Sequence, residues 1–477
     1  MAVFYNKGEQ KIRPGVYQRH VNNDIDTPTG AQDGICAIPI QASWGPLNTV
    51  VKCTNALQLE QTYGQGTYGT GYTVPAAIEM FNAGAAVVYT YRLGTGGSTA
   101  SKSIVAGLTV TAKYPGTMPI SVAVQNKLGF TNTKQFLVYA GTTQVEAFEF
   151  AANTTTEAAN LIAAVGSNSN YVTVAVTGEE APAVVPILAV SAGALAGGAN
   201  PTVNNASYSS AFTALEPYYY NTIALDVDDD DNLTLSLLLQ EYLDNAYTYG
   251  KLGIAVVGEK TTVAFETRLN HAASFNDAKV VYLGGGYMVG DTSKDGVLGI
   301  CYTAGVIAST PSNRGITHST ITGATALCES LTFAQYVNAI QSGMLMVSMA
   351  PDGSIWYDSG IDTLLSPDDA TQDIGWKKIR RVKVRFELID RMDRALSPKV
   401  GKVSADSDGI SDIIQTGQRV LDTMSLSEGK LQPGATFYED PDNEYTTDSA
   451  WFIISAVDID SLEKIYLQYK FRYSQNG

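Results

Sequence analysis

KIYLQYKFRY, residues 464–473, is the stretch around which the rest of this chain is organised. Ile465, Leu467, Tyr469 and Phe471 fall on one side of an extended chain, and more polar residues fall on the other. This period of two predicts a half-buried β-strand about 30 Å long, at about 3.3 Å per residue. Because the strand lies at the C-terminal end, it is free to pair within its own domain or to add to the sheet edge of a neighbour.

Length and composition indicate a multidomain protein with ordinary globular cores. The chain has 477 residues, a length typical of two to four domains, and 45% of them are hydrophobic. The net charge of −16 argues against direct nucleic-acid binding, which needs a basic surface. No apolar run approaches the length that crosses a bilayer, so we expect no membrane insertion.

The N-terminus and the cysteines both favour folding in a reducing cytoplasm. The first fifteen residues lack the continuous apolar core of a secretory signal. The four cysteines have no CxxC spacing, which favours reduced, mostly buried thiols over a disulfide framework or a zinc site: Cys36, Cys53, Cys301 and Cys328.

The N-terminal end offers a second strand-forming segment outside any obvious core. Residues 1–30 are polar and turn-rich, and within residues 11–21 only Ile12, Val16 and Tyr17 could form a short strand. Two interpretations stay open for this region, a solvated tail and an arm that orders on a partner.

A central α/β domain is predicted for residues 31–97 plus 206–365. The runs LGIAVVG and AKVVYLG are continuously apolar, as strands of a parallel sheet are when both faces are covered. Strands and helices alternate along this part of the chain. We expect strands at 35–40, 85–93, 222–227, 252–257, 279–283 and 344–349, and helices at 57–63, 74–81, 233–247, 261–275, 297–308 and 333–341.

Two further domains complete the predicted α/β, α+β multidomain fold. Residues 98–205 are rich in Thr, Val, Ala and Gly, and short strands at 108–113, 118–125, 135–140, 144–150 and 171–176 with one helix at 156–165 predict an inserted β-sandwich. Residues 366–463 predict an α+β domain with helices at 376–396 and 410–424. Its strand at 451–457 is expected to be an antiparallel neighbour of the terminal strand, which with residues 474–477 forms the C-terminal arm, 464–477.

The residues that would support catalysis do not form a recognisable set. Only three histidines are present, and none has a spaced partner that resembles a metal site or a catalytic triad: His20, His271 and His318. We therefore predict no catalytic residue, no metal site and no cofactor. An α/β hydrolase is the less favoured enzymatic alternative, and it would need a nucleophile beside one of these histidines.

Two short motifs invite ligand-binding interpretations that their details do not favour. The run GGGYMVG at 284–290 follows a predicted strand, but it fits neither G-x-G-x-x-G nor a lysine-terminated phosphate loop, so a tight turn is favoured. Five aspartates between 226 and 231 resemble a calcium loop by charge alone, because the required Gly and closing Glu are missing. They precede a predicted helix, whose N-terminus acidic residues stabilise.

Residues 376–396 are unusually basic for this acidic chain, beginning with Lys377, Lys378, Arg380 and Arg381. Two interpretations stay open, a solvated face whose cations pair with acids along the helix and a contact with an acidic partner surface. The portion VKVRFELI also fits a strand.

The order of several weak motifs resembles the tail sheath proteins of contractile phage tails and phage-tail-like bacteriocins, most closely those of Gram-positive phages and defective prophages. The similarity spans nearly the whole chain, and its motifs are RPGVY at 13–17, WGP at 44–46, the strand at 85–93, LTF at 331–333, Ala339-Ile340 with Gly343, DG at 352–353, GIDTL at 360–364, the basic helix and the terminal strand.

This resemblance implies a structural and mechanical role. The α/β domain would have the subtilisin-like fold of family sheaths without catalysis. Subunits would stack as hexameric rings in a helical cylinder around an inner tail tube, with baseplate and tail terminator proteins as further partners. Contraction would drive the tube through the host envelope. The particle, a virion tail or a phage-tail-like bacteriocin, would be assembled in the host cytoplasm.

Residue assignments follow from the same resemblance, with the β-sandwich facing outwards and the C-terminal domain innermost. A static self-assembling shell or surface-layer protein remains the main structural alternative. The inter-subunit arms are Ile12, Val16, Tyr17, Ile465, Leu467, Tyr469 and Phe471; the recipient sheet is Trp451, Ile453 and Ser455; and the tube or inter-subunit contacts are Lys377, Lys378, Arg380 and Arg381.

Overall fold

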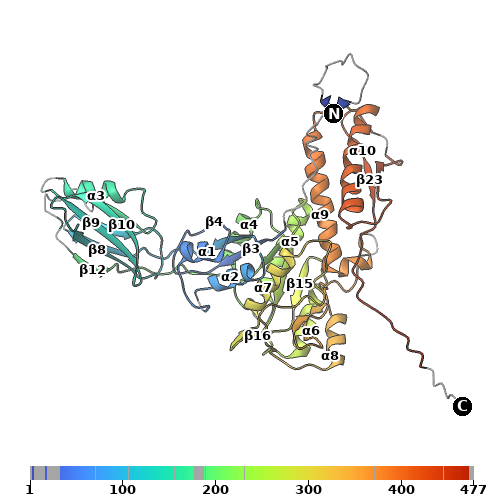
Figure 1. Ribbon diagram of the computed structural model, residues 1–477, viewed down its shortest axis with the longest axis horizontal. Coiled ribbons are helices and arrows are strands. Elements are labelled where there is room, and N and C mark those ends of the chain that lie inside the picture. Colours follow the sequence, from blue (N-terminus) through green and yellow to red (C-terminus); the bar gives the residue numbers. More distant parts are fainter. Residues whose placement is uncertain are drawn as a thin grey trace.

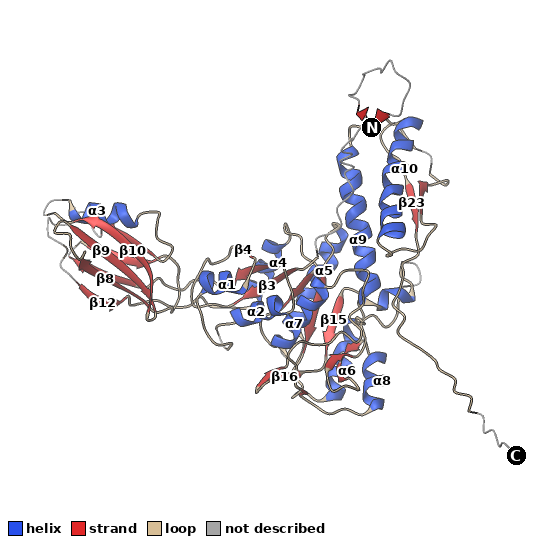
Figure 2. Cartoon of the chain, in the orientation of Figure 1, coloured by secondary structure: helices blue, strands red, loops and turns tan. Residues whose placement is uncertain are grey.

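The computed structural model describes residues 33–471, apart from residues 70, 106, 154–155, 177–186, 188–189, 230, 369–370 and 444, and the backbone of two short N-terminal strands. The described chain is elongated (Figure 1). A β-sandwich lies at one end, a mixed sheet with its helices lies in the middle, and a pair of long helices rises on the far side (Figure 2). The C-terminal segment leaves this body as an extended chain (Figure 1).

The central sheet contains seven strands in the order β19-β15-β14-β13-β3-β5-β4. Neighbouring strands are parallel except at the edge, where β4 runs antiparallel to β5. The continuously apolar strands lie inside the sheet, as predicted. The strands are β3 Ile35–Ile40, β4 Val50–Cys53, β5 Val87–Arg92, β13 Thr222–Ala224, β14 Ile254–Gly258, β15 Val280–Leu283 and β19 Met344–Leu345.

Helices cover both faces of this sheet and form two apolar cores. One core contains side chains of α1 Ala56–Tyr63, α2 Val74–Asn82 and α7 Val297–Ser309. The other contains side chains of α4 Asn205–Leu215, α5 Thr234–Thr248 and α6 Phe265–Phe275. The sequence did not predict α4, whose NASYSSAFTAL run is rich in serine and weakly amphipathic, although an Asn204–Ser207 capping box starts it.

Smaller sheets lie at one end of the central sheet, beside α8 Phe333–Gln341. The strand predicted at 344–349 divides after Leu345, because β20 Val347–Met349 pairs with β21 Ile355–Tyr357 instead of staying in the central sheet. A three-stranded sheet completes this region: β16 Tyr287–Val289, β17 Thr292–Lys294 and β18 Ala326–Leu327.

The β-sandwich has a four-stranded sheet, β10-β9-β8-β12, and a three-stranded sheet, β11-β7-β6, around their own apolar core. The five strands and the helix predicted here are present, and two more were missed, β6 and β12. The elements are β6 Ser101–Val105, β7 Leu108–Ala112, β8 Ile120–Asn126, β9 Thr133–Ala140, β10 Thr143–Ala151, α3 Glu157–Val165, β11 Val172–Val176 and β12 Val190–Ala194.

The C-terminal part contains two long helices, α9 Ile379–Leu396 and α10 Ser407–Asp422, and a two-stranded sheet. VKVRFELI is therefore helical, and its strand alternative is wrong. Short helical turns flank these helices at Ile374–Lys377, Ser397–Lys399 and Thr423–Ser427. The sheet pairs β22 Thr436–Glu439 with β23 Phe452–Ser455.

The expected pairing of residues 451–457 with the terminal strand is wrong. The partner of β23 is β22, which precedes it in a hairpin, and the described residues 464–471 form no strand in this chain. Alternation shows which side chains share a face of an extended segment, but it does not show where the backbone partner comes from. At the N-terminus, β1 Val3–Phe4 pairs in parallel with β2 Tyr17–Gln18, while Ile12 and Val16 lie outside the described residues.

The structure also bears on the expectations for membrane-spanning segments and for the cysteines. No helix of the described chain is both long and apolar enough to cross a membrane. The cysteine thiols are free, as predicted, and three of the four are buried: Cys36, Cys53 and Cys301.

Candidate inter-subunit interface

The β22–β23 sheet is closed on one edge and open on the other. Gln418 on α10 donates from its side-chain amide to the carbonyl of Ala435, 2.9 Å away, and accepts from the N–H of Phe437 at 2.9 Å. This side chain occupies the outer edge of β22. Among the described residues, β23 pairs with β22 alone, so its other edge can receive a further strand.

The helix-facing side of β23 is only partly covered. Ile454 is paired with the buried Phe437, and Phe452 stacks on that ring at 5.2 Å, so these side chains point towards the helices. Ile454 nevertheless remains 41% exposed. The sheet therefore leaves the helix-facing side of β23 partly open to solvent.

A groove runs between α9 and this open edge. Its apolar lining comes from both elements, with Val384 and Leu388 on α9 and Ile454 and Ala456 on the strand side. The residues predicted for the recipient sheet, Trp451, Ile453 and Ser455, belong to the alternate positions of the same extended stretch and point away from the helices. Sequence reasoning thus found the strand but missed Ile454, because alternation alone does not identify the helix-facing side.

A charged cluster closes one end of the groove. Asp458 accepts from Arg381 at 2.6 and 2.7 Å and from Arg385 Nε at 3.2 Å. Arg385 also donates to Asp373 at 2.9 Å and lies over the Trp376 ring, 4.7 Å from its centroid. Burial raises the pKa of Asp458, but the two guanidinium groups outweigh it and hold that pKa below its usual value.

The four cations predicted to contact a tube or a neighbour have partners in their own chain. Lys377 donates to the carbonyl of Leu365, and Arg381 pairs with Asp458 as described above. Lys378 pairs with Glu463, and Arg380 donates to Ser461 at 2.9 Å. Three of the four therefore hold residues 458–463 against α9, and we call these residues the anchor segment. A contact of the four cations with another molecule stays a prediction.

Beyond the anchor segment, residues 464–471 have no strand partner among the described residues. Their apolar side chains are 70–92% exposed: Ile465, Leu467, Tyr469 and Phe471. Figure 1 shows this segment running away from the folded body. A soluble protein rarely leaves so many large apolar side chains uncovered unless they meet another surface. Of the predicted N-terminal arm residues, only the backbone of Tyr17, in β2, is described.

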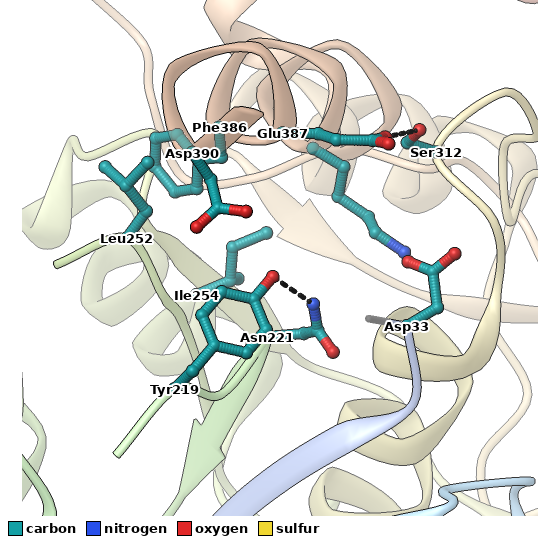
Figure 3. Close-up of a pocket in the computed structure, with 10 residues that line it drawn as sticks. Asp33, Tyr219, Asn221, Leu252, Ile254, Ser312, Phe386, Glu387 and Asp390 are labelled. Atoms are coloured by element: carbon teal, nitrogen blue, oxygen red, sulfur yellow. Dashed lines mark hydrogen bonds between the residues drawn. The ribbon is translucent and has the colours of Figure 1, made fainter. Parts of the chain in front are cut away.

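The opposite face of α9 meets the central sheet through buried charges (Figure 3). Lys383 donates to the carbonyls of Ile307, at 2.6 Å, and of Thr310, at the C-terminal end of α7, where a cation is favoured by the helix dipole. Burial lowers the pKa of Lys383 to about 8. Glu387, one turn further along, accepts from Ser312 and from Lys430 Nζ at 2.7 Å. Hydrogen bonds of buried charged side chains on α9 thus join the C-terminal part to the central domain.

The residues that could have supported catalysis are engaged in structural contacts. His271 Nδ1 lies 2.7 Å from a Glu259 carboxylate oxygen, and the His318 ring stacks on Trp356 at 3.9 Å, while His20 lies outside the described residues. A Cβ atom on Gly284 would overlap the Met344 sulfur, so this glycine allows close packing. In the described chain, no group of three or more His, Cys, Asp or Glu side chains could hold a metal ion.

The aspartate run also has local structural roles. Asp229 accepts from the N–H groups of Leu235 and Ser236 in the first turn of α5, and Asp228 pairs with Lys260 at 2.6 Å. Asp226 lies at the carboxyl end of β13, next to β3, where the strand order reverses and open α/β sheets commonly bind ligands. The carboxylate is fully buried and accepts from Thr73 at 2.6 Å and Tyr208 at 2.7 Å.

Replacing Asp226 with asparagine is expected to alter the pH dependence of stability. Burial raises the pKa of this carboxyl to about 6, although hydrogen bonds from Thr73 and Tyr208 oppose the shift. The folded pKa lies above the unfolded one, so the contribution of the proton is fully present below about pH 4 and is lost as pH rises through about 6. Wild type should lose about 3 kcal/mol relative to Asp226→Asn between these limits. Urea denaturation of both chains across this range measures it, and a pH-independent difference would contradict it.

Comparison with known proteins places these features in a family. The model of the phage tail sheath protein central domain matches residues 201–357, and that of the tail sheath protein Gp18 domain III N-terminal region matches residues 34–93. Both matches fall mainly on the central sheet and its helices. The chain therefore contains two regions that match tail sheath domains, and it has the fold of contractile sheath subunits.

Individual relatives agree with this assignment. The uncharacterized protein YqbK of Bacillus subtilis (strain 168) is 23% identical over 97% of this chain and 98% of its own length. The phage-like element PBSX protein XkdK of the same organism is 27% identical over 48% of this chain and 49% of its own. A sheath tail protein from Desulfitobacterium hafniense shares the fold with a TM-score of 0.70 at 18% identity, covering 93% of this chain and 100% of that one.

The helical sheath of the anti-feeding prophage in its contracted state also shares the fold. Its TM-score is 0.55 at 9% identity, with 97% of this chain and 99% of that chain covered. The family and these neighbours are structural sheath proteins, the class that the motif order resembled.

Proposed function

We propose that this chain polymerises as stacked hexameric rings around an inner tail tube, and that the cylinder shortens to drive the tube through a host envelope. It would act in a phage or phage-tail-like particle assembled in the host cytoplasm, with baseplate and terminator proteins at the cylinder ends. Support comes from the sheath domains of the chain and from similar folds in a contracted helical sheath and in a baseplate.

The observation that carries the assembly model is the open edge of β23 beside a half-covered groove. An extended segment of a second subunit would complete the sheet there, forming main-chain hydrogen bonds and covering Ile454 and Leu388. The C-terminal arm fits this role, because its exposed apolar residues alternate with polar ones and have no strand partner in the part of the chain that the structure describes. Arms that add strands to neighbours would tether subunits through large rigid-body movements.

Charge supports the same pairing. The arm carries Lys464 and Lys470 and no acidic residue. The β22–β23 hairpin is acidic, with Glu439, Asp440, Asp442 and Asp448. Opposite charges on the two segments would favour encounter and fix the register of the added strand.

We further propose that the β-sandwich faces outwards and that the C-terminal helices lie innermost. The sandwich is at the opposite end of the chain from α10, which agrees with such a radial order (Figure 1). The contacts between α9 and the anchor segment would then affect assembly indirectly, because they fix the point at which the arm leaves its own subunit. These contacts are made by Lys378, Arg380 and Arg381. The extended cylinder would be metastable, held by a kinetic barrier until it is triggered.

Replacing Ile454 with glutamate tests the proposed function. A carboxylate in the groove should prevent strand addition, because burying it without a partner is costly, yet the half-exposed site should tolerate it in the monomer. We expect a folded chain that forms no cylinders in electron micrographs, whereas wild type forms both long and short ones. Leu237→Glu, at a 42% exposed site on α5, is the matched control and should assemble. Cylinders of a single length from wild type would favour a static shell, and normal assembly of Ile454→Glu would contradict the groove.

A further inference from the structure

The β-sandwich is joined to the central sheet by two chain crossings that run side by side. Thr95 and Thr202 exchange backbone hydrogen bonds of 2.9 and 3.0 Å, and Ser98 and Ala199 exchange bonds of 3.1 and 3.0 Å. A narrow two-stranded ribbon of this kind is a weak support on its own. By itself it would let the sandwich bend relative to the sheet.

A third connection comes from the side chain of Arg92, the last residue of β5. The residue is fully buried, and its Nε donates to the carbonyl of Ala42 at 3.0 Å. One terminal nitrogen donates to Gly45 at 2.8 Å, and the other donates to Pro115, in the sandwich, at 2.8 Å. Burial lowers the pKa of Arg92 to about 10, so the group stays charged at neutral pH and its planar fork holds three carbonyls in fixed directions.

The segment held by Arg92 also enters the sandwich. Trp44 is buried in the sandwich core, edge-on to Tyr114 at 5.1 Å and stacked on Tyr171 at 5.9 Å. Ser43 accepts from the N–H of Met118 at 3.2 Å. A Cβ atom on Gly116 would overlap the carbonyl oxygen of Ser43, so the two backbones touch at this point.

Space for movement exists beside this junction. An open cleft borders Trp44 and Tyr171 and is lined on the central side by Gln61 and Thr62 and on the sandwich side by Val145 and Asn170. The sandwich therefore has room to swing towards the central body, and the contacts of Arg92 oppose that swing.

We propose that Arg92 is a conformational lock that fixes the angle between the β-sandwich and the central sheet. The two bodies then move as one unit in an assembly. Without the guanidinium, three carbonyls lose a donor, two of them in buried contacts, and the loop that carries Trp44 is free to shift towards water. The lock does not depend on the proposed function, because its contacts are complete within one chain.

The test measures the angle directly in the full chain. Spin labels are placed at Thr142→Cys on the sandwich and Glu266→Cys on α6, in a Cys328→Ser background, since the other three thiols are buried. Labelled chains are diluted into an excess of unlabelled wild type, so that only distances within one subunit are recorded. We expect one narrow distance distribution for the otherwise wild-type chain and at least a twofold broadening for Arg92→Met.

Two further variants keep the result interpretable. Lys113→Met removes a cation that donates to the carbonyl of Ser169 within the sandwich, and it should leave the distribution narrow. Arg92→Lys keeps the charge but loses the planar fork, so it should broaden the distribution even if the methionine variant does not fold. A broad distribution in the wild-type background, or a narrow one in both Arg92 variants, would overturn the proposal.

Discussion

Deletion of residues 464–477 is expected to leave a folded monomer that no longer polymerises. The described part of this segment pairs with no other described strand, and its apolar side chains are at least 70% exposed, so the fold should lose little. In an assembly, each of these side chains would contribute about 1.5–3 kcal/mol when buried. Loss of even about 4 kcal/mol per contact raises the critical concentration about 1000-fold.

The truncation should end at Glu463, so that the anchor segment keeps its contacts with α9. Sedimentation measures the critical concentration, and circular dichroism checks the fold. Leu467→Asp in the full-length chain should reproduce most of the defect, while Gln468→Ser on the opposite face of the arm is the matched control. Deleting residues 1–20 should also prevent polymerisation, if the N-terminal segment is the second arm. Normal cylinders from both truncated chains would contradict the strand-exchange model.

Replacing Glu387 with methionine is expected to destabilise the junction between α9 and the central sheet by about 3–5 kcal/mol. Its carboxylate accepts from Ser312, from Lys430 and, at 2.5 Å, from Arg391. Removing it leaves the buried Lys430 ammonium with Glu428 alone, 2.7 Å away. A buried ammonium that keeps only a partly exposed partner is under-compensated, and this costs more than the lost pair contributes.

The double variant Glu387→Met, Lys430→Met is the informative comparison. Because both charges are then absent, it should be more stable than the Glu387 single variant. Lys399→Met is the surface control, since its pair with Asp412 is about one-third exposed and should be worth less than about 1 kcal/mol. Urea denaturation measures the differences in unfolding free energy, and limited proteolysis shows whether the loss is at α9. A double variant less stable than the single one would show that the pair stabilises the junction by itself.

Local patterns predicted most of the central sheet and the sandwich. LGIAVVG and AKVVYLG are confirmed as β14 and β15, because strands covered on both faces need apolar residues at every position. The elements that were missed carry weaker signals. The edge strand β4 reads VVKC, and α4 carries several serines, so neither has a strong period.

For the candidate interface, the sequence predicted the strand at 451–457 and the alternation of the arm. It did not predict that these two segments are not paired with each other within one chain. It assigned the recipient side chains to Trp451, Ile453 and Ser455, whereas the groove is lined by Ile454 and Ala456. It also left open whether the basic helix is solvated or bound to a partner. The structure adds a third outcome, in which Lys378, Arg380 and Arg381 hold the anchor segment.

The sequence by itself determined most of the helices and strands and which family the chain resembles, because these depend on neighbouring residues and on motif order. Only the tertiary structure decided that Gln418 closes one edge of the β22–β23 sheet, that the other edge stays open beside a groove, and that Arg92 joins two bodies. These features join residues far apart in the chain or depend on a missing partner, and no periodicity records either.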